Sequence, residues 1–237
     1  MMSRYRSVLW LLFSFTLLLI PSSLCAYQIA DQEIVVKTKD NVNTAIVGTI
    51  TKGSDGEGSY ASFNGSESYI NIGTLSKIDD MTNGLHIRFK AVWTGFSNWS
   101  RIFDCGMTGS TKSSFFVANQ GTGSNLYIGM HDAADSIKAD TAIGNVLTTG
   151  SVEEWDITIS SNANGNAVTA IDLRDGNRSY VPSRTATSAL VAVERPRCYI
   201  GKSLSPDSPF YGRIYYVKVE TLNQRISLID FDASKME

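Results

Sequence analysis

Two acidic side chains, two positions apart, are the first sign of chemistry in the chain. Glu154 and Asp156 fall in a run of alternating polar and apolar residues, so both point to one strand face, about 7 Å apart. Paired carboxylates can hydrolyse a glycosidic bond. The pattern Glu-x-Asp-x-x-Glu fails at its third position, where Ile159 stands. We therefore predict no catalytic residue and interpret the pair as part of a solvated polar face.

Other kinds of reactive site are poorly supported. The chain has no Gly-x-Ser-x-Gly motif, no His-Glu-x-x-His motif and no phosphate-binding glycine loop ahead of a helix. Its two histidines, His86 and His131, exclude a centre built from several histidines. The segment His131-Asp-Ala-Ala-Asp135 could supply oxygen ligands to a metal, although such a segment is also typical of a plain loop. The sequence makes no cofactor certain, and a single calcium ion remains open.

Residues 1–26 have the layout of a secretory signal peptide. Arg4 and Arg6 precede a 13-residue apolar run, residues 8–20, which Pro21 ends. The run is shorter than the roughly 20 residues of an ordinary membrane span. We expect cleavage near residue 26 and a mature chain without a transmembrane segment, secreted, or periplasmic if the source is bacterial. An uncleaved anchor is the alternative.

Two cysteines, Cys105 and Cys198, remain after the signal. An even number of cysteines in an exported chain predicts a disulfide. The bridge would close a loop of nearly a hundred residues, which the chain-entropy estimate rates at about 4–5 kcal/mol. Two buried free thiols are the alternative.

Composition excludes several partners. The 237 residues are 43% hydrophobic and 19% charged, which indicates a folded core. Without residues 1–26, 19 basic residues face 23 acidic ones, and no basic run occurs. We therefore expect neither nucleic acid nor a membrane surface as a partner.

The elements that must position any site are short strands. Runs with a period of two are separated by Gly, Asn, Ser and Asp, and no helical period is found. Residues 132–145 are the least regular and are expected to form a short helix or a long loop. About a dozen strands predict an all-β fold, a two-sheet antiparallel sandwich with residues 27–237 as a single domain. The runs are 33–38, 45–50, 60–63, 69–72, 85–91, 101–105, 115–118, 126–130, 154–160, 168–174, 198–202, 213–220 and 226–231.

The same alternation separates core positions from candidate binding positions. We predict that nine apolar residues fill the layer between the sheets: Leu85, Ile87, Phe89, Trp155, Ile157, Ile159, Ile214, Val217 and Val219. Seven others are candidate ligand-binding residues. These are the outward basic row His86, Arg88 and Lys90, which could meet an acidic glycan, and the loop or turn residues Trp99, Lys202, Asp207 and Tyr211.

Six segments follow one another in one order between residues 59 and 220. They are Ala61-Ser-Phe-Asn-Gly-Ser66 with Tyr69-Ile-Asn-Ile72, Leu85-His-Ile-Arg-Phe-Lys-Ala-Val-Trp93, Arg101-Ile-Phe-Asp-Cys-Gly106, Trp155-Asp-Ile-Thr-Ile159, Ala170-Ile-Asp-Leu-Arg-Asp-Gly176, and Tyr199-Ile-Gly-Lys-Ser203 with Phe210-Tyr-Gly-Arg-Ile214. In this order they resemble laminin-G-like and pentraxin-like domains of the concanavalin A-like lectin/glucanase superfamily. The resemblance implies a jelly-roll sandwich in which Phe210 is buried. The chain also departs from the family, because Tyr215 and Tyr216 replace the usual acidic pair and Asp207 is the single carboxylate where pentraxins hold calcium.

Together these features favour a secreted, non-catalytic binding or adhesion module that recognises a glycan or an extracellular protein. Two alternatives stay open. One is a carbohydrate-active enzyme, a glycosidase or lyase, on the same jelly-roll fold. The other is a structural extracellular protein without a ligand. Fold resemblance alone does not separate them.

Overall fold

The computed structural model describes residues 45–174, 178–181 and 188–236. The expected signal peptide and the strand predicted at 33–38 lie outside these residues. The described chain forms fifteen strands and two short 3-10 helices, η1 (Asp79–Asn83) and η2 (Ala233–Lys235). The strands are β1 (Ala45–Val47), β2 (Ile50–Asp55), β3 (Gly58–Asn64), β4 (Tyr69–Leu75), β5 (Gly84–Trp93), β6 (Arg101–Gly106), β7 (Phe115–Asn119), β8 (Leu126–His131), β9 (Ile137–Ile143), β10 (Glu153–Asn162), β11 (Gly165–Asp172), β12 (Arg178–Tyr180), β13 (Arg195–Ile200), β14 (Tyr211–Thr221) and β15 (Ser227–Asp232).

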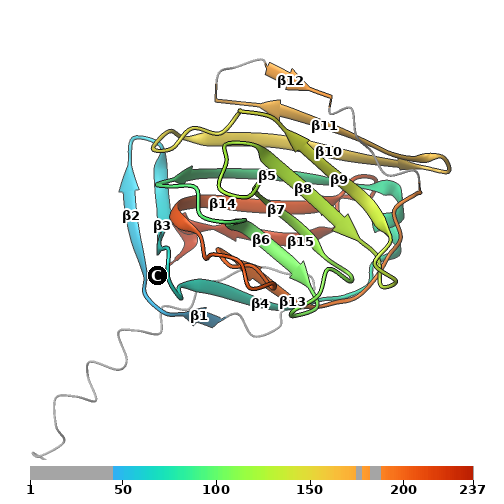
Figure 1. Ribbon diagram of the computed structural model, residues 1–237, viewed down its shortest axis with the longest axis horizontal. Helices are drawn as coiled ribbons and strands as arrows, with labels where there is room; N and C mark the ends of the chain where they lie inside the picture. The colour runs from blue at the N-terminus through green and yellow to red at the C-terminus, as the bar shows by residue number, and fades with distance from the viewer. Residues whose placement is uncertain (1–44, 175–177, 182–187, 237) are drawn as a thin grey trace, which may run out of the picture. The chain divides into compact units, whose positions relative to one another are not determined.

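The strands form two antiparallel sheets packed face to face as a jelly-roll sandwich, which confirms the predicted fold class. One sheet has seven strands in the order β1-β4-β13-β6-β7-β8-β9. The other has eight, in the order β12-β11-β10-β5-β14-β3-β2 with β15 beside β14. In Figure 1, β6 to β9 lie in front of β5, β14 and β15. No helix among the described residues is long and apolar enough to cross a membrane.

Alternating side chains build the core, as the sequence predicts. Trp155 on β10 lies opposite Phe89 on β5, and Phe89 lies opposite Val217 on β14, so one row of apolar side chains crosses three strands. All nine predicted core residues, and Phe210, are at most 1% exposed. Burying each such side chain contributes about 1.5–3 kcal/mol, so this row is a main source of stability.

Two predictions of local structure were wrong. Within residues 132–145 the chain forms β9 instead of a helix or loop, and β9 pairs with β8. Its inward positions include Ala139 and Thr141, which are too small or too polar to make the alternation visible in the sequence. The strand predicted at 45–50 is broken at Gly48, whose φ of 74° turns the chain from β1 in one sheet to β2 in the other.

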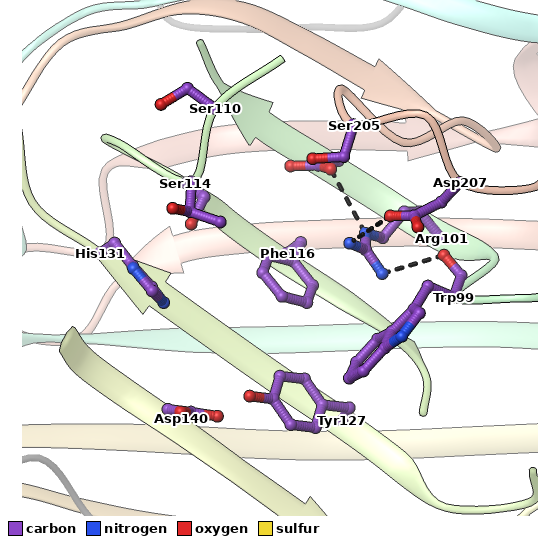
Figure 2. Close-up of a pocket in the computed structure, with 12 residues that line it drawn as sticks. Trp99, Arg101, Ser110, Ser114, Phe116, Tyr127, His131, Asp140, Ser205 and Asp207 are labelled. Carbon is purple, nitrogen blue, oxygen red and sulfur yellow. Dashed lines mark hydrogen bonds and ion pairs between the residues drawn. The ribbon is translucent and has the colours of Figure 1, made fainter. Parts of the chain in front are cut away.

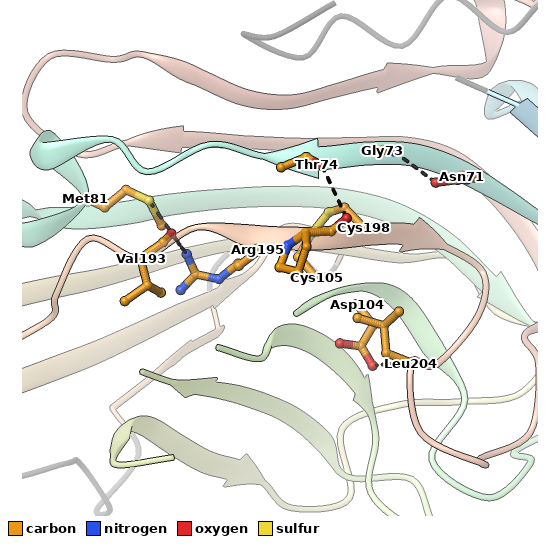
Figure 3. Close-up of a disulfide and its surroundings, with 11 residues drawn as sticks. Asn71, Gly73, Thr74, Met81, Asp104, Cys105, Val193, Arg195, Cys198 and Leu204 are labelled. Atoms are coloured by element: carbon orange, nitrogen blue, oxygen red, sulfur yellow. Dashed lines mark hydrogen bonds between the residues drawn. A yellow bond between two sulfur atoms is a disulfide. The ribbon is translucent and has the colours of Figure 1, made fainter. Parts of the chain in front are cut away.

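A disulfide joins Cys105 on β6 to Cys198 on β13, as predicted. The two residues lie directly opposite each other in the ladder, with their α-carbons 3.9 Å apart. Figure 3 shows the bridge beneath β4, and both side chains are buried. The bridge closes a loop between positions 93 apart, so it ties the centre of the seven-stranded sheet to a late segment of the chain.

Candidate functional site

A hollow lies on the outer face of the seven-stranded sheet. Its volume is about 340 Å³, and Figure 2 shows the side chains around it. Strands β6 to β9 form its floor, and the loops before β6, before β7 and after β13 form its walls. The lining residues are Trp99, Arg101, Asp104, Ser110, Thr111, Ser114, Phe116, Tyr127, His131, Asp140, Ser205 and Asp207. We call this hollow the outer-face pocket.

Sheet register brings distant residues into the floor. Across four neighbouring strands, Asp104 lies opposite Phe116, Phe116 opposite Gly129, and Gly129 opposite Asp140. Directly opposed residues share a sheet face, so this row faces outward while Phe115 and Val117 face the core. A side chain at Gly129 would meet the Phe116 ring at 2.5 Å, so the glycine makes room for that ring.

Three aromatic rings form one continuous surface in the pocket. The Trp99 and Tyr127 rings meet edge to face with centroids 4.9 Å apart, and Tyr127 and Phe116 are stacked at 5.7 Å. Phe116 is only 8% exposed, whereas Trp99 and Tyr127 are half-buried. Trp99 and Tyr127 therefore supply the ring surface that a ligand can reach.

Arg101 holds the wall next to these rings. Its guanidinium lies 4.1 Å from the Phe116 ring centre, donates to Asp104 at 3.3 Å and to Asp207 at 3.1 Å, and donates to the Trp99 carbonyl at 2.9 Å. Burial raises the pKa of Asp104, and the neighbouring Arg101 opposes that rise. These contacts neutralise the one buried cation of the pocket, so Arg101 is a positioning residue.

One lining residue of the pocket has a strained backbone. Trp99 adopts a φ of 52°, in the left-handed region that residues with a side chain rarely occupy. Ser113, next to the lining residue Ser114, and Asp135, which contacts the lining residue His131, adopt φ values of 58° and 68°. The Trp99 amide donates to Gly121 at 2.8 Å, and its carbonyl accepts from Arg101. Such conformations persist only where surrounding contacts hold them, and they concentrate at functional sites.

Several polar groups of the pocket have no protein partner. Ser114 is 5% exposed and its hydroxyl makes no hydrogen bond, which is costly for a buried group. Among the described residues the Asp140 carboxylate makes no hydrogen bond or ion pair. His131 lines the pocket and contacts Asp135 through Nδ1 at 2.9 Å, which leaves Nε2 without a hydrogen-bond partner among the described residues. These groups can bind a ligand that both donates and accepts hydrogen bonds.

Asp132, in the acidic loop after β8, makes hydrogen bonds and an ion pair with nearby residues of the chain. Asp132 accepts from the amides of Ala134 and Ser136 at 2.9 Å and 2.8 Å, and pairs with Lys138 at 3.2 Å. Over the ranges that the structure describes, no group of three or more His, Cys, Asp or Glu side chains is arranged to hold a metal ion.

The pocket brings together only two of the seven predicted binding residues, Trp99 and Asp207. Lys202 instead lies over the Tyr69 ring, 4.3 Å from its centre. Tyr211 begins β14 and is 45% exposed beside Gly65. Both are outside the lining of the pocket.

The predicted basic row lies on the outer face of the eight-stranded sheet, on the other side of the sandwich. His86 contacts Asp156 at 2.7 Å and Glu220 at 2.9 Å, and Lys90 contacts Glu57 at 2.6 Å. Arg88 is exposed between them. Part of the row's charge is thus neutralised, and Asp156 of the acidic pair serves as a partner of His86.

Sequence reasoning missed most of the pocket. Arg101, Phe116, Tyr127 and Asp140 come from four strands, and their meeting depends on a register that one sequence does not reveal. A local signal existed for Tyr127, because it alternates with the inward residues Leu126 and Ile128.

No protein-family model and no curated protein sequence matches the chain. The solved structures that are similar to the chain include the following three. The enzymatically active domain of tailspike protein 2 from bacteriophage CBA120 has a TM-score of 0.50 and 12% identity, over 76% of this chain and 29% of that chain. Domain 4 of AbnA, an extracellular GH43 arabinanase from Geobacillus stearothermophilus solved with arabinotriose, has a TM-score of 0.48 and 14% identity, over 81% and 85%. A heptameric SAP-like pentraxin from Limulus polyphemus has a TM-score of 0.42 and 14% identity, over 68% and 74%.

Proposed function

We propose that this protein is an exported, non-catalytic module that binds a glycan in the outer-face pocket. One observation carries the proposal: two reachable aromatic rings, Trp99 and Tyr127, stand beside polar groups that lack protein partners. Pockets that combine a few fixed polar groups with aromatic walls are typical ligand sites.

The proposed contacts follow from the chemistry of a sugar ring. Its apolar C–H face stacks on the Trp99 and Tyr127 rings, which keep a nearly fixed orientation. Its hydroxyl groups hydrogen-bond to Ser114 and to the free nitrogen of His131. Because Ser114 is buried without a partner, a bound hydroxyl would remove an existing cost as well as add a contact.

The acidic groups of the pocket favour binding over hydrolysis. A glycosidase needs two carboxyl groups that flank the scissile bond. Asp104 and Asp207 are both engaged by Arg101, which leaves Asp140 as the one unengaged carboxylate among the lining residues. An enzyme of this fold would have to break the Arg101 contacts to use the other two.

The remaining features of the proposal come from the sequence. We propose that residues 1–26 are a cleaved signal peptide and that residues 27–237 form a single domain of the laminin-G-like or pentraxin-like type. The six sequence segments that occur in the family's order between residues 59 and 220 support that assignment. The buried disulfide supports export, because such bonds persist in oxidising compartments.

A glycan array with matched variants tests the function. Wild type, Trp99→Ala, and the double variant Arg88→Ser with Lys90→Ser are applied to one array, and bound glycans are assayed for cleavage. We expect wild type and the double variant to bind the same glycans, and Trp99→Ala to lose at least tenfold in affinity. Loss of binding only in the double variant would place the site on the basic row. Cleavage products would identify an enzyme, and no binding would favour a structural protein.

A further inference from the structure

The charges of the outer-face pocket are unbalanced. Among the groups that line it, one guanidinium, Arg101, faces three carboxylates, Asp104, Asp140 and Asp207. Arg101 is already shared by two of them, at 3.3 Å and 3.1 Å. The other titratable base, His131, is paired with Asp135 at 2.9 Å. Asp140 therefore has no cation opposite it among the described residues.

The position of Asp140 makes this imbalance relevant to a ligand. Asp140 lies directly opposite Gly129, between the outward positions of Tyr127 and His131 on β8. Gly129 carries no side chain, and the Phe116 ring covers it. The carboxylate thus stands at the edge of the aromatic surface, where a group attached to a stacked sugar ring would lie (Figure 2).

A neutral or anionic ligand fits this edge poorly. When an uncharged sugar ring binds over Asp140, the carboxylate loses its water and gains no countercharge. This desolvation is unfavourable. A sulfate or uronate group would be repelled, because the single guanidinium is already engaged. An ammonium group would form a charge-assisted hydrogen bond with the carboxylate.

A second and independent observation points to a ligand with hydroxyl groups. The buried Ser114 hydroxyl, 5% exposed and without a partner, lines the same pocket. Aromatic walls, an unsatisfied hydroxyl and an unpaired carboxylate together match a ring that carries both hydroxyl and amino groups.

We infer that the outer-face pocket selects amino sugars whose amine is free, with the ammonium on Asp140. The inference rests on the proposed function and deepens it by naming the substrate class. It departs from the acidic glycan that the basic row of the sequence suggested.

The test compares two forms of one sugar chain, one that carries ammonium groups and one that does not. The probes are β-1,4-linked glucosamine oligomers and the same oligomers after N-acetylation, titrated calorimetrically into the folded protein at low salt. We expect wild type to prefer the amine form by about tenfold or more, as for a hydrogen bond between charged groups. The preference should shrink as salt rises.

Matched variants test whether Asp140 causes the preference for the amine form. Asp140→Asn keeps the shape of the side chain and removes its charge. This variant should reduce the ratio of the affinities for the amine and N-acetylated oligomers to about one. Asp79→Asn, on η1 with a side chain 93% exposed, is the control and should keep it. Since the Asp140 carboxylate makes no hydrogen bond or ion pair with the described residues, its variant should melt within a few degrees of wild type.

Three results would each overturn the inference. Wild type could bind both oligomers with equal affinity, Asp140→Asn could keep the preference for the amine form, or the glucosamine oligomers could fail to bind. The proposed function survives each of these outcomes if any glycan still binds in a Trp99-dependent way. It fails separately if no glycan binds, or if binding does not depend on Trp99.

Discussion

The guanidinium of Arg101 lies 3.1 Å from the carboxylate of Asp207, a residue 106 positions further along the chain. Ser203 donates to the same carboxylate at 3.0 Å, and the Leu204 amide donates to the neighbouring Asp104 at 3.0 Å. The loop after β13 is therefore bound to β6 by polar contacts. One wall of the outer-face pocket depends on this attachment.

Asp207→Asn should weaken the wall. The change removes a charged acceptor from a largely buried contact, and such bonds contribute about 1.5–3 kcal/mol. We expect a loss of stability near the lower end of that range, because Asp104 still holds Arg101, together with weaker glycan binding. Urea unfolding measures the first effect. Asp230→Asn, which breaks the more exposed contact with Lys235, is the control and should change stability by less than about 1 kcal/mol. Equal effects of the two changes would contradict the account.

Replacing Trp99 should separate stability from binding. At its φ of 52°, glycine is less strained than alanine by about 1 kcal/mol. We expect Trp99→Gly to be more stable than Trp99→Ala by about that amount, while both lose binding. Denaturant midpoints at constant slope give the comparison. If alanine is the more stable replacement, the left-handed conformation of Trp99 is not under strain.

The sequence predicts the layers of this fold better than its site. Core residues such as Phe89 and Trp155 are visible because a period of two holds over ten-residue strands. Strand β9 was missed because Ala139 and Thr141 weaken the pattern. The pocket is harder still, since placing Phe116 beside Asp140 requires the register of three strands, which arises from long-range pairing.

Removing the disulfide should cost stability without changing the fold. Cys105→Ala with Cys198→Ala frees a long loop in the unfolded chain, and native bridges of this kind typically contribute about 2–5 kcal/mol. We expect a lower denaturant midpoint for the double variant and for the reduced wild type. Reduction should leave the double variant unaffected. Equal stability of oxidised and reduced wild type would show that the bridge contributes nothing.

Glu153 should make stability depend on pH. It is buried, contacts Arg174 and accepts from the Thr148 amide at 2.7 Å. Burial raises the pKa of Glu153 from 4.5 to about 7. A raised pKa means that, between these two values, the folded protein keeps a proton that the unfolded chain releases. The contribution of protonated Glu153 to the free energy of unfolding is therefore complete below about pH 4.5 and is lost as the pH rises through about 7.

Glu153→Gln tests this dependence. We expect the free energy of unfolding of wild type to fall relative to the variant by roughly 3 kcal/mol across that window, since each unit of pKa shift corresponds to about 1.4 kcal/mol. Unfolding curves for both proteins between pH 4 and pH 8 give the difference. Parallel curves would show that Glu153 keeps an ordinary pKa.

Tryptophan fluorescence during glycan titration tests the central claim most directly. Of the three tryptophans in the described ranges, Trp93 and Trp155 are fully buried and Trp99 is half-buried in the pocket. A sugar that stacks on Trp99 should shift the emission to shorter wavelength and saturate at the affinity found by calorimetry, and Trp99→Phe should lose the shift while still melting like wild type. Saturable binding with no change in emission, or the same change in Trp99→Phe, would contradict glycan recognition in the outer-face pocket.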